Sequence, residues 1–148
     1  MKKATSEDGN GTEELIIAGE EGDIGVSNPA FAPWNYDLYS YDGSKVVSVF
    51  PEMEFGYRTN FSLYDNGVIG VSYSGSAAES GTDFYKIGSD GITPELLDSF
   101  SVVWQLEGEE PKASYYQKDK EITEEAYKDC LQDYETPLPE ELSWQEIY

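Results

Sequence analysis

Hydrophobic and polar positions alternate along the second half of the chain with the two-residue period of β-strands. The alternation is clearest in residues 99–106, where one side of the strand would carry four apolar residues, Phe100, Val102, Trp104 and Leu106. The positions between them are mostly polar. Because successive side chains of a strand point to opposite faces, the pattern predicts one face on the core and one face in water.

Three Asx-Gly dipeptides divide the middle of the chain into hairpins. Asp42-Gly43, Asn66-Gly67 and Asp90-Gly91 each lie between two runs that are rich in aromatic and β-branched residues. Such dipeptides accept the positive φ angles of tight hairpin turns, so their succession predicts an antiparallel meander. Pro94 indicates that the return strand of the third hairpin begins late or lies at an edge, because proline cannot donate a hydrogen bond to the ladder.

After Ile122 the period of the apolar residues changes to that of an α-helix. Thr123 is a good N-cap, and Glu124 and Glu125 are favourably placed in the first turn. Five further residues then recur at helical spacing, namely Ala126, Tyr127, Cys130, Leu131 and Tyr134. We therefore predict a mainly β fold, an antiparallel meander sheet of about six to eight strands with one C-terminal helix, and keep α+β as the alternative class.

The length of 148 residues is that of one domain. We expect a single β-rich domain over residues 1–148, with a flexible segment over residues 1–12 and a Pro-containing acidic tail over residues 136–148. Residues 72–82 consist almost wholly of small side chains and are expected to form a surface loop.

The charge and the missing residue types exclude several classes of function. The chain has 30 Asp and Glu against 9 Lys and Arg, a net charge of −21, which disfavours direct binding to nucleic acid or to an anionic membrane. It contains no His, the commonest general base, and its lone Cys130 excludes an internal disulfide and a CxxC zinc site. No run is long enough for a transmembrane helix, so we expect no membrane insertion. We also expect no enzymatic activity.

The acidic stretch at residues 6–19, SEDGNGTEELIIAG, has some features of a calcium loop. Its candidate oxygen ligands are Asp8, Asn10, Glu14 and the carbonyl of Thr12. Counted from Ser6, the twelfth position of an EF-hand loop would need an acidic residue, and Ile17 stands there. The sequence is therefore compatible only with a weak calcium site, with a dissociation constant of roughly 10⁻⁴ to 10⁻³ M. The alternative is a metal-free turn supported by Asx side chains, which leads into a strand.

Aromatic residues offer a second candidate site. Tyrosine, phenylalanine and tryptophan make up 14% of the chain. Trp34, Tyr39 and Tyr41, together with the small residues 76–81, could form a surface on which sugar rings or a peptide stack. The alternative is that these aromatic side chains fill the core.

Four stretches in order, DGNGTEELII, YDLYSYDGSKVV, DFYKIGSDG and KEITEEAY, cover most of residues 8–127. Together they resemble a loosely defined set of secreted or cell-surface proteins of Gram-positive gut bacteria. Those proteins carry an Asp-x-Asp-Gly-Asp-Gly-x-x-Glu-Leu calcium-type loop followed by an aromatic β-meander. The resemblance implies an exported module and a calcium-type loop, although Ser6 and Asn10 stand where that pattern has Asp.

These observations lead to one expected function and one alternative. We expect a non-catalytic module of an exported or cell-surface protein that binds a glycan, peptide or protein partner or acts as a scaffold, with calcium as the one candidate cofactor. The alternative is a cytoplasmic acidic inhibitor that mimics nucleic acid. The basic start of the chain has no apolar segment behind it, so as written it is neither a signal peptide nor a membrane anchor.

Overall fold

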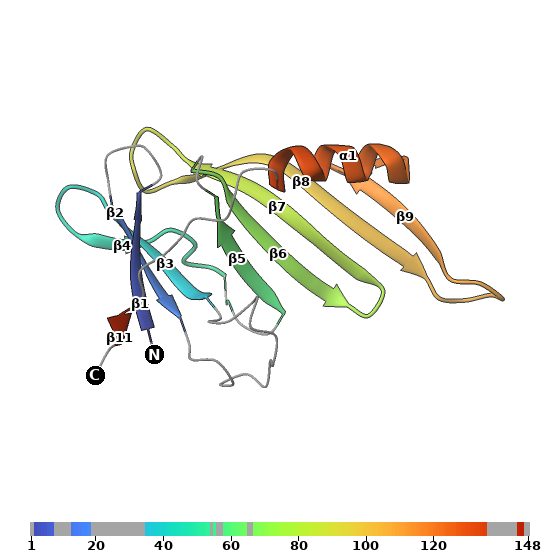
Figure 1. Cartoon of the computed structure of the whole chain (residues 1–148), viewed down its shortest axis with the longest axis horizontal. Coiled ribbons are helices and arrows are strands. Elements are labelled where there is room, and N and C mark those ends of the chain that lie inside the picture. The colour runs from blue at the N-terminus through green and yellow to red at the C-terminus, as the bar shows by residue number, and fades with distance from the viewer. Residues whose placement is uncertain are drawn as a thin grey trace.

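The fold is that of a computed structural model, which describes residues 2–7, 13–18, 35–53, 55, 58–64, 67–135 and 145–146, with side chains described from residue 37 to residue 134 within these ranges. The described residues form two antiparallel sheets and one α-helix near the C-terminus (Figure 1). This confirms the predicted mainly β class, the antiparallel meander and the C-terminal helix.

The first sheet has five strands in the order β11-β1-β2-β3-β4. Its strands are β1 (Lys2–Glu7), β2 (Glu13–Ala18), β3 (Asn35–Tyr41), β4 (Val46–Ser48) and β11 (Gln145–Glu146). β1 lies in the segment predicted to be flexible, and it forms a strand here because it pairs along its whole length with β2. β11 lies in the predicted tail and pairs with β1, while residues 136–144 lie outside the described residues.

The second sheet is a six-stranded meander in the order β10-β9-β8-β7-β6-β5. Its strands are β5 (Thr59–Leu63), β6 (Ile69–Ser76), β7 (Glu79–Ile87), β8 (Pro94–Gln105), β9 (Lys112–Gln117) and β10 (Lys120–Ile122). β8 begins at Pro94, which confirms the late start. It lies between β7 and β9, so it is not an edge strand.

The turns between strands follow the predicted dipeptides. Gly43, Gly67 and Gly91 have φ angles of +98°, +81° and +78°, which L-residues with side chains rarely adopt. At the first turn, Asp42 Oδ1 accepts hydrogen bonds from the backbone N–H of Ser44 and of Lys45, both at 2.8 Å. The local sequence therefore determines where the chain reverses.

The prediction of a surface loop at residues 72–82 is wrong. These residues extend β6 and β7 as a hairpin, and only Ala77 and Ala78 form its turn. The hydroxyl groups of Ser72 and Thr82 lie 3.2 Å apart across the strands. Tyr73 lies against Gly81, since a Cβ added to this glycine would be 2.5 Å from the tyrosine hydroxyl oxygen. Cross-strand contacts thus stabilise a segment whose residues individually favour loops.

The helix α1 (Glu124–Glu135) packs on one face of the six-stranded sheet (Figure 1). Phe84 and Phe100 are fully buried beneath it, and the ring of Tyr134 stacks on Phe84 with centroids 4.5 Å apart. Thr123 Oγ1 accepts a hydrogen bond from the backbone N–H of Ala126 at 3.1 Å, which confirms the predicted N-cap. No helix among the described residues is both long and apolar enough to span a membrane.

The core face predicted for β8 is only partly buried. Phe100 lies fully under the helix, whereas Trp104 and Leu106, farther along, are 40% and 59% exposed. The ring of Phe100 contacts Phe84 of the neighbouring strand β7 and both Tyr127 and Tyr134 of α1. The predicted core face is therefore buried at Phe100, which contacts α1, and is exposed at Trp104 and Leu106.

A second hydrophobic core lies between the two sheets. Its buried residues come from β3 and the segment after β4 on one side and from β5, β6 and β7 on the other, namely Leu38, Val49, Phe50, Phe61, Ile69, Val71 and Ile87. Ile69 and Val71 alternate along β6 with Gly70, which contacts Phe84 under the helix. The six-stranded sheet therefore carries the helix on one face and the five-stranded sheet on the other.

Candidate functional site

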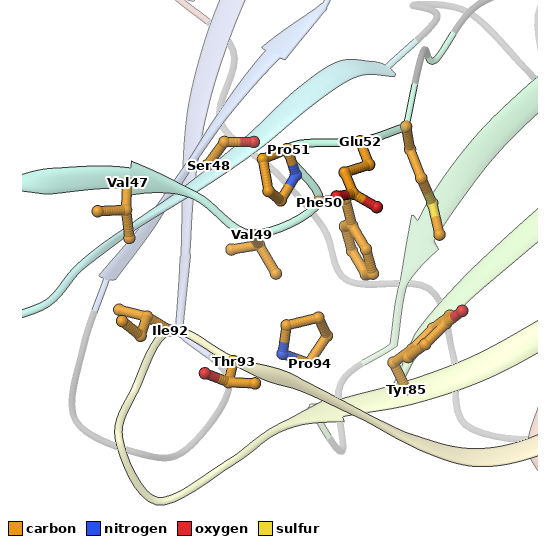
Figure 2. Close-up of a pocket in the computed structure, with 11 residues that line it drawn as sticks. Val47, Ser48, Val49, Phe50, Pro51, Glu52, Tyr85, Ile92, Thr93 and Pro94 are labelled. Atoms are coloured by element: carbon orange, nitrogen blue, oxygen red, sulfur yellow. The ribbon is translucent and has the colours of Figure 1, made fainter.

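A pocket of about 480 Å³ lies where the edge of the five-stranded sheet meets the hairpin between β7 and β8 (Figure 2). Most of its wall is apolar and comes from Val47, Val49, Phe50, Pro51, Met53, Ile92 and Pro94. The other lining residues are Ser48, Glu52, Tyr85 and Thr93. Ligand sites in proteins commonly combine a mainly apolar wall with a few polar groups in this way.

One wall of the pocket is supplied by β4. Val47 pairs with Ser40 of β3, and Ser40 is buried between the sheets. Since paired residues in a sheet point to the same side, Val47 faces inward, and Val49, two residues further, does the same. Figure 2 shows both valines facing Ile92 and Pro94 across the cavity.

The opposite wall is the turn that leads into β8. Asp90 holds this turn because its carboxylate accepts hydrogen bonds from the backbone N–H of Ile92 at 3.0 Å and from both the N–H and the hydroxyl of Thr93. These bonds, from the Thr93 hydroxyl first, lower the pKa of Asp90 below its usual value. Ser40 Oγ donates to the carbonyl oxygen of Gly91 at 2.6 Å, and so ties the turn to the five-stranded sheet.

Aromatic rings close one end of the pocket. Phe50 packs edge to face against Tyr85, with ring centroids 5.2 Å apart and an interplanar angle of 70°. Burial, and then the nearby carboxylate of Asp83, raise the pKa of Tyr85 above its usual value. Tyr85 is therefore uncharged at neutral pH and presents an apolar ring with a neutral hydroxyl group.

The polar groups around the pocket are few, and two of them are already engaged. Ser48 Oγ donates to Asp37 Oδ1 at 3.1 Å, and Thr93 Oγ1 donates to Asp90. Glu52 is exposed and is the acidic residue of the lining, which contains no basic residue. The pocket thus combines an apolar interior with a negatively charged rim.

The structure places the predicted aromatic residues on a different surface. Tyr39 and Tyr41 share the face of β3 opposite to buried Leu38 and Ser40, and therefore point away from the pocket. A hydrogen bond to Asp37, followed by burial and by the charge of that carboxylate, raises the pKa of Tyr39.

Exposure distinguishes the two tyrosines of this face. Tyr41 is 49% exposed and donates to the carbonyl of Gly43 at 3.0 Å, whereas Tyr39 is partly buried. Trp34 lies outside the described residues. Residues 76–81 belong to β6, β7 and the turn between them, in the other sheet. The structure therefore brings Tyr39 and Tyr41 together but separates them from the small residues.

The candidate calcium ligands fall mostly outside the described residues, as Asp8, Asn10 and Thr12 do. Glu14 lies in β2, where its backbone pairs with Ser6 of β1, so the acidic loop connects two antiparallel strands. In the part of the chain that the structure describes, no three His, Cys, Asp or Glu side chains form a group that could hold a metal ion. The calcium site stays a prediction.

Sequence reasoning missed the pocket. The run VVSVFPEM at residues 46–53 is a detectable signal, since it places apolar residues next to a proline directly after a hairpin turn. Its partners, Tyr85 and residues 92–94, belong to a different hairpin and a different sheet. That juxtaposition depends on how the two sheets pack.

No protein-family model, no curated protein and no solved structure matches this chain.

Proposed function

We propose that this protein is a non-catalytic binding module of an exported or cell-surface protein, and that it binds an apolar group of its partner in the pocket between β4 and the start of β8. The resemblance of the sequence to secreted and surface proteins supports the location. The pocket supports the binding role, and it is the one observation that carries the proposal.

The size and lining of the pocket suit an apolar side chain or a small molecule. Its volume of about 480 Å³ lies within the range of roughly 300 to 1,000 Å³ that ligand sites occupy. Complete burial of one Val, Leu, Ile or Phe side chain of the partner would contribute about 1.5 to 3 kcal/mol. Two turns anchored by aspartates, Asp42 and Asp90, hold the pocket walls in place before any ligand arrives.

The ionisable groups around the pocket suit binding better than catalysis. Glycoside hydrolysis by carboxylates requires two such groups across the site, and the one that acts as the general acid has a raised pKa. The lining residues contain a single carboxylate, from Glu52, and it is exposed to solvent. The pKa of Tyr85 is raised, so its hydroxyl group is neutral and can form a hydrogen bond with a ligand.

An NMR titration with two small apolar probes, indole and N-acetyl-leucine amide, tests the proposal. We expect chemical-shift changes at the amides of Val47, Val49 and Ile92. Val47→Trp should fill the pocket and abolish these changes, whereas Val46→Trp should preserve them, because Val46 is 62% exposed and lies on the opposite face of the same strand. Probe binding that survives Val47→Trp unchanged would remove the pocket from the binding site.

A second candidate is stacking of a glycan on the outer face of β3, favoured by the exposure of Tyr41. Screening on a glycan array should then show binding by the wild type that is reduced by Tyr41→Ala. Wild-type binding that Tyr41→Ala does not weaken would exclude this face.

A further inference from the structure

The pocket lies beside a free sheet edge. β4 is the last strand of the five-stranded sheet, and in the described part of the chain β3 is the one strand that pairs with it. An edge strand presents backbone N–H and C=O groups that have no partner strand, so it can pair with a segment from another chain. β4 therefore offers directional hydrogen bonds beside an apolar site.

The register of the ladder identifies the groups that face this edge. Asp42 N–H donates to the carbonyl of Lys45 at 3.1 Å, and Val49 N–H donates to that of Leu38 at 2.8 Å. Along a strand of an antiparallel pair, the backbone N–H and C=O groups of alternate residues bond to the partner strand, and those of the residues between them point away from it. Lys45, Val47 and Val49 bond toward β3, which directs the backbone groups of Val46 and Ser48 to the free edge.

The side chains of an added strand would reach the pocket. A strand on the free edge of β4 continues the same pleated surface, so its alternate side chains point to the same side as Val47 and Val49. That side is the pocket, whose far wall is Ile92 and Pro94 (Figure 2). The backbone bonds and the apolar pocket would then be used by one ligand, as in recognition by strand addition.

The negative charge of the protein indicates that its partner carries basic residues. The chain carries a net charge of −21, and the rim of the pocket carries the exposed carboxylate of Glu52. Lys45 lies at the opposite end of β4. A peptide segment with basic residues at the Glu52 end and none beside Lys45 is complementary in charge to this edge. The negative electrostatic potential of the whole protein would attract such a segment and raise its rate of association.

We propose that the ligand of the pocket is an extended, basic peptide segment that adds to β4 as a further strand and inserts an apolar side chain between Val49 and Pro94. This inference rests on the proposed function, because it names the ligand class of the same pocket. A peptide backbone supplies donors and acceptors at the repeat that the edge of a strand requires, which a lipid or a sugar lacks.

Calorimetric titration with the peptide acetyl-Lys-Thr-Val-Thr-Val-Thr-amide tests the mode of binding. Two derivatives carry N-methyl groups on the odd or on the even backbone amides, with identical side chains. In a bound strand one set of amides bonds to β4 and the other faces solvent. We therefore expect one derivative to bind at least about tenfold more weakly and the other to bind nearly as the parent does. Equal affinity of the two derivatives would overturn strand addition.

Substitution of the edge itself gives an independent readout. Val46→Pro removes an N–H that faces the free edge and leaves the bonds to β3 intact, while Val46→Ala shortens the same side chain and keeps the N–H. We expect Val46→Pro to weaken the peptide roughly three- to tenfold relative to Val46→Ala, with similar melting temperatures for both variants. Equal peptide affinities in two folded variants contradict the inference.

The small probes separate failure of this inference from failure of the proposed function. Binding of indole at Val47 and Ile92 without binding of the peptide overturns strand addition and leaves the pocket as a binding site. Binding of neither overturns both. A sedimentation coefficient that depends on protein concentration, and that loses this dependence in Val46→Pro, would show dimerisation through β4. That result would overturn the peptide as the ligand in favour of a second copy of the chain.

Discussion

The hydrogen bond between Ser40 and Gly91 links the two sheets beside the pocket, and its removal by Ser40→Ala should measurably lower the free energy of unfolding. Ser40 is 2% exposed, and its hydroxyl group donates to the Gly91 carbonyl at 2.6 Å. The substitution removes one buried oxygen atom and leaves the backbone of β3 unchanged. It therefore tests a single contact between β3 and the turn that begins β8.

The expected magnitude follows from the burial of the two partners. Loss of a hydrogen bond costs a net 0.5 to 1.5 kcal/mol or so, and an acceptor left without a partner in a buried position raises the cost to about 1 to 3 kcal/mol. Gly91 is only partly buried, so water can replace some of the lost bond. We expect a decrease of about 1 to 2 kcal/mol. With a urea m-value of about 2 kcal/mol/M, the midpoint would fall by roughly 0.5 to 1 M.

Urea unfolding followed by far-UV circular dichroism measures this decrease, and an unchanged m-value shows that the compactness of the two states is preserved. Ser62→Ala is the matched control, because Ser62 is an exposed strand residue of the six-stranded sheet and should change the stability by less than about 0.5 kcal/mol. If Ser40→Ala and Ser62→Ala destabilise the protein equally, the contact between the sheets does not stabilise the fold and the reasoning fails.

Three further predictions address the core, a close approach and a turn. Phe100→Ala removes a fully buried ring under the helix and should lower the unfolding free energy by about 3 to 5 kcal/mol in a denaturant titration. Gly81→Ala places a methyl group 2.5 Å from a backbone carbonyl oxygen and should cost about 1 to 3 kcal/mol, whereas Gly75→Ala meets no atom closer than 4.0 Å and should cost less. The lowered pKa of Asp90 means that the hydrogen bonds to its carboxylate are complete above the usual Asp pKa and are lost as the pH falls through the lowered value. Thr93→Ala should return the pKa of Asp90 toward the usual value in a carboxyl-carbon NMR titration. An unchanged pKa in this variant would contradict the assigned cause.

Local sequence patterns predicted most of the fold because they act over a few residues. The Asx-Gly turns follow from the φ angles that glycine accepts, and the start of α1 follows from the side-chain cap of Thr123. The strands formed within residues 72–82 were not predicted from composition, because small residues such as glycine and alanine are depleted in strands. Their pairing with the neighbouring strand, and the contact of Tyr73 with Gly81, stabilise the hairpin in the folded protein.

The candidate site was less predictable than the fold. Tyr39 and Tyr41 are two residues apart in β3 and share one face of the strand, which follows from strand geometry alone. That geometry could not show which face of the sheet would meet the second sheet. The apolar run that contains Val47 and Val49 is visible in the sequence. These valines line a pocket because β4 and the segment after it face the turn at Ile92 and Pro94.

The sequence by itself determined the strand periods, the positions of the chain reversals, the capped helix and the strongly acidic surface, since each depends on neighbouring residues or on a sum over the chain. Only the tertiary structure decided the division into two sheets, the burial of Phe100 under α1, the position of β4 as an edge strand among the described strands, and the pocket beside it. These features depend on contacts between residues far apart in the chain, such as Ser40 and Gly91, and no local pattern encodes which distant partners meet.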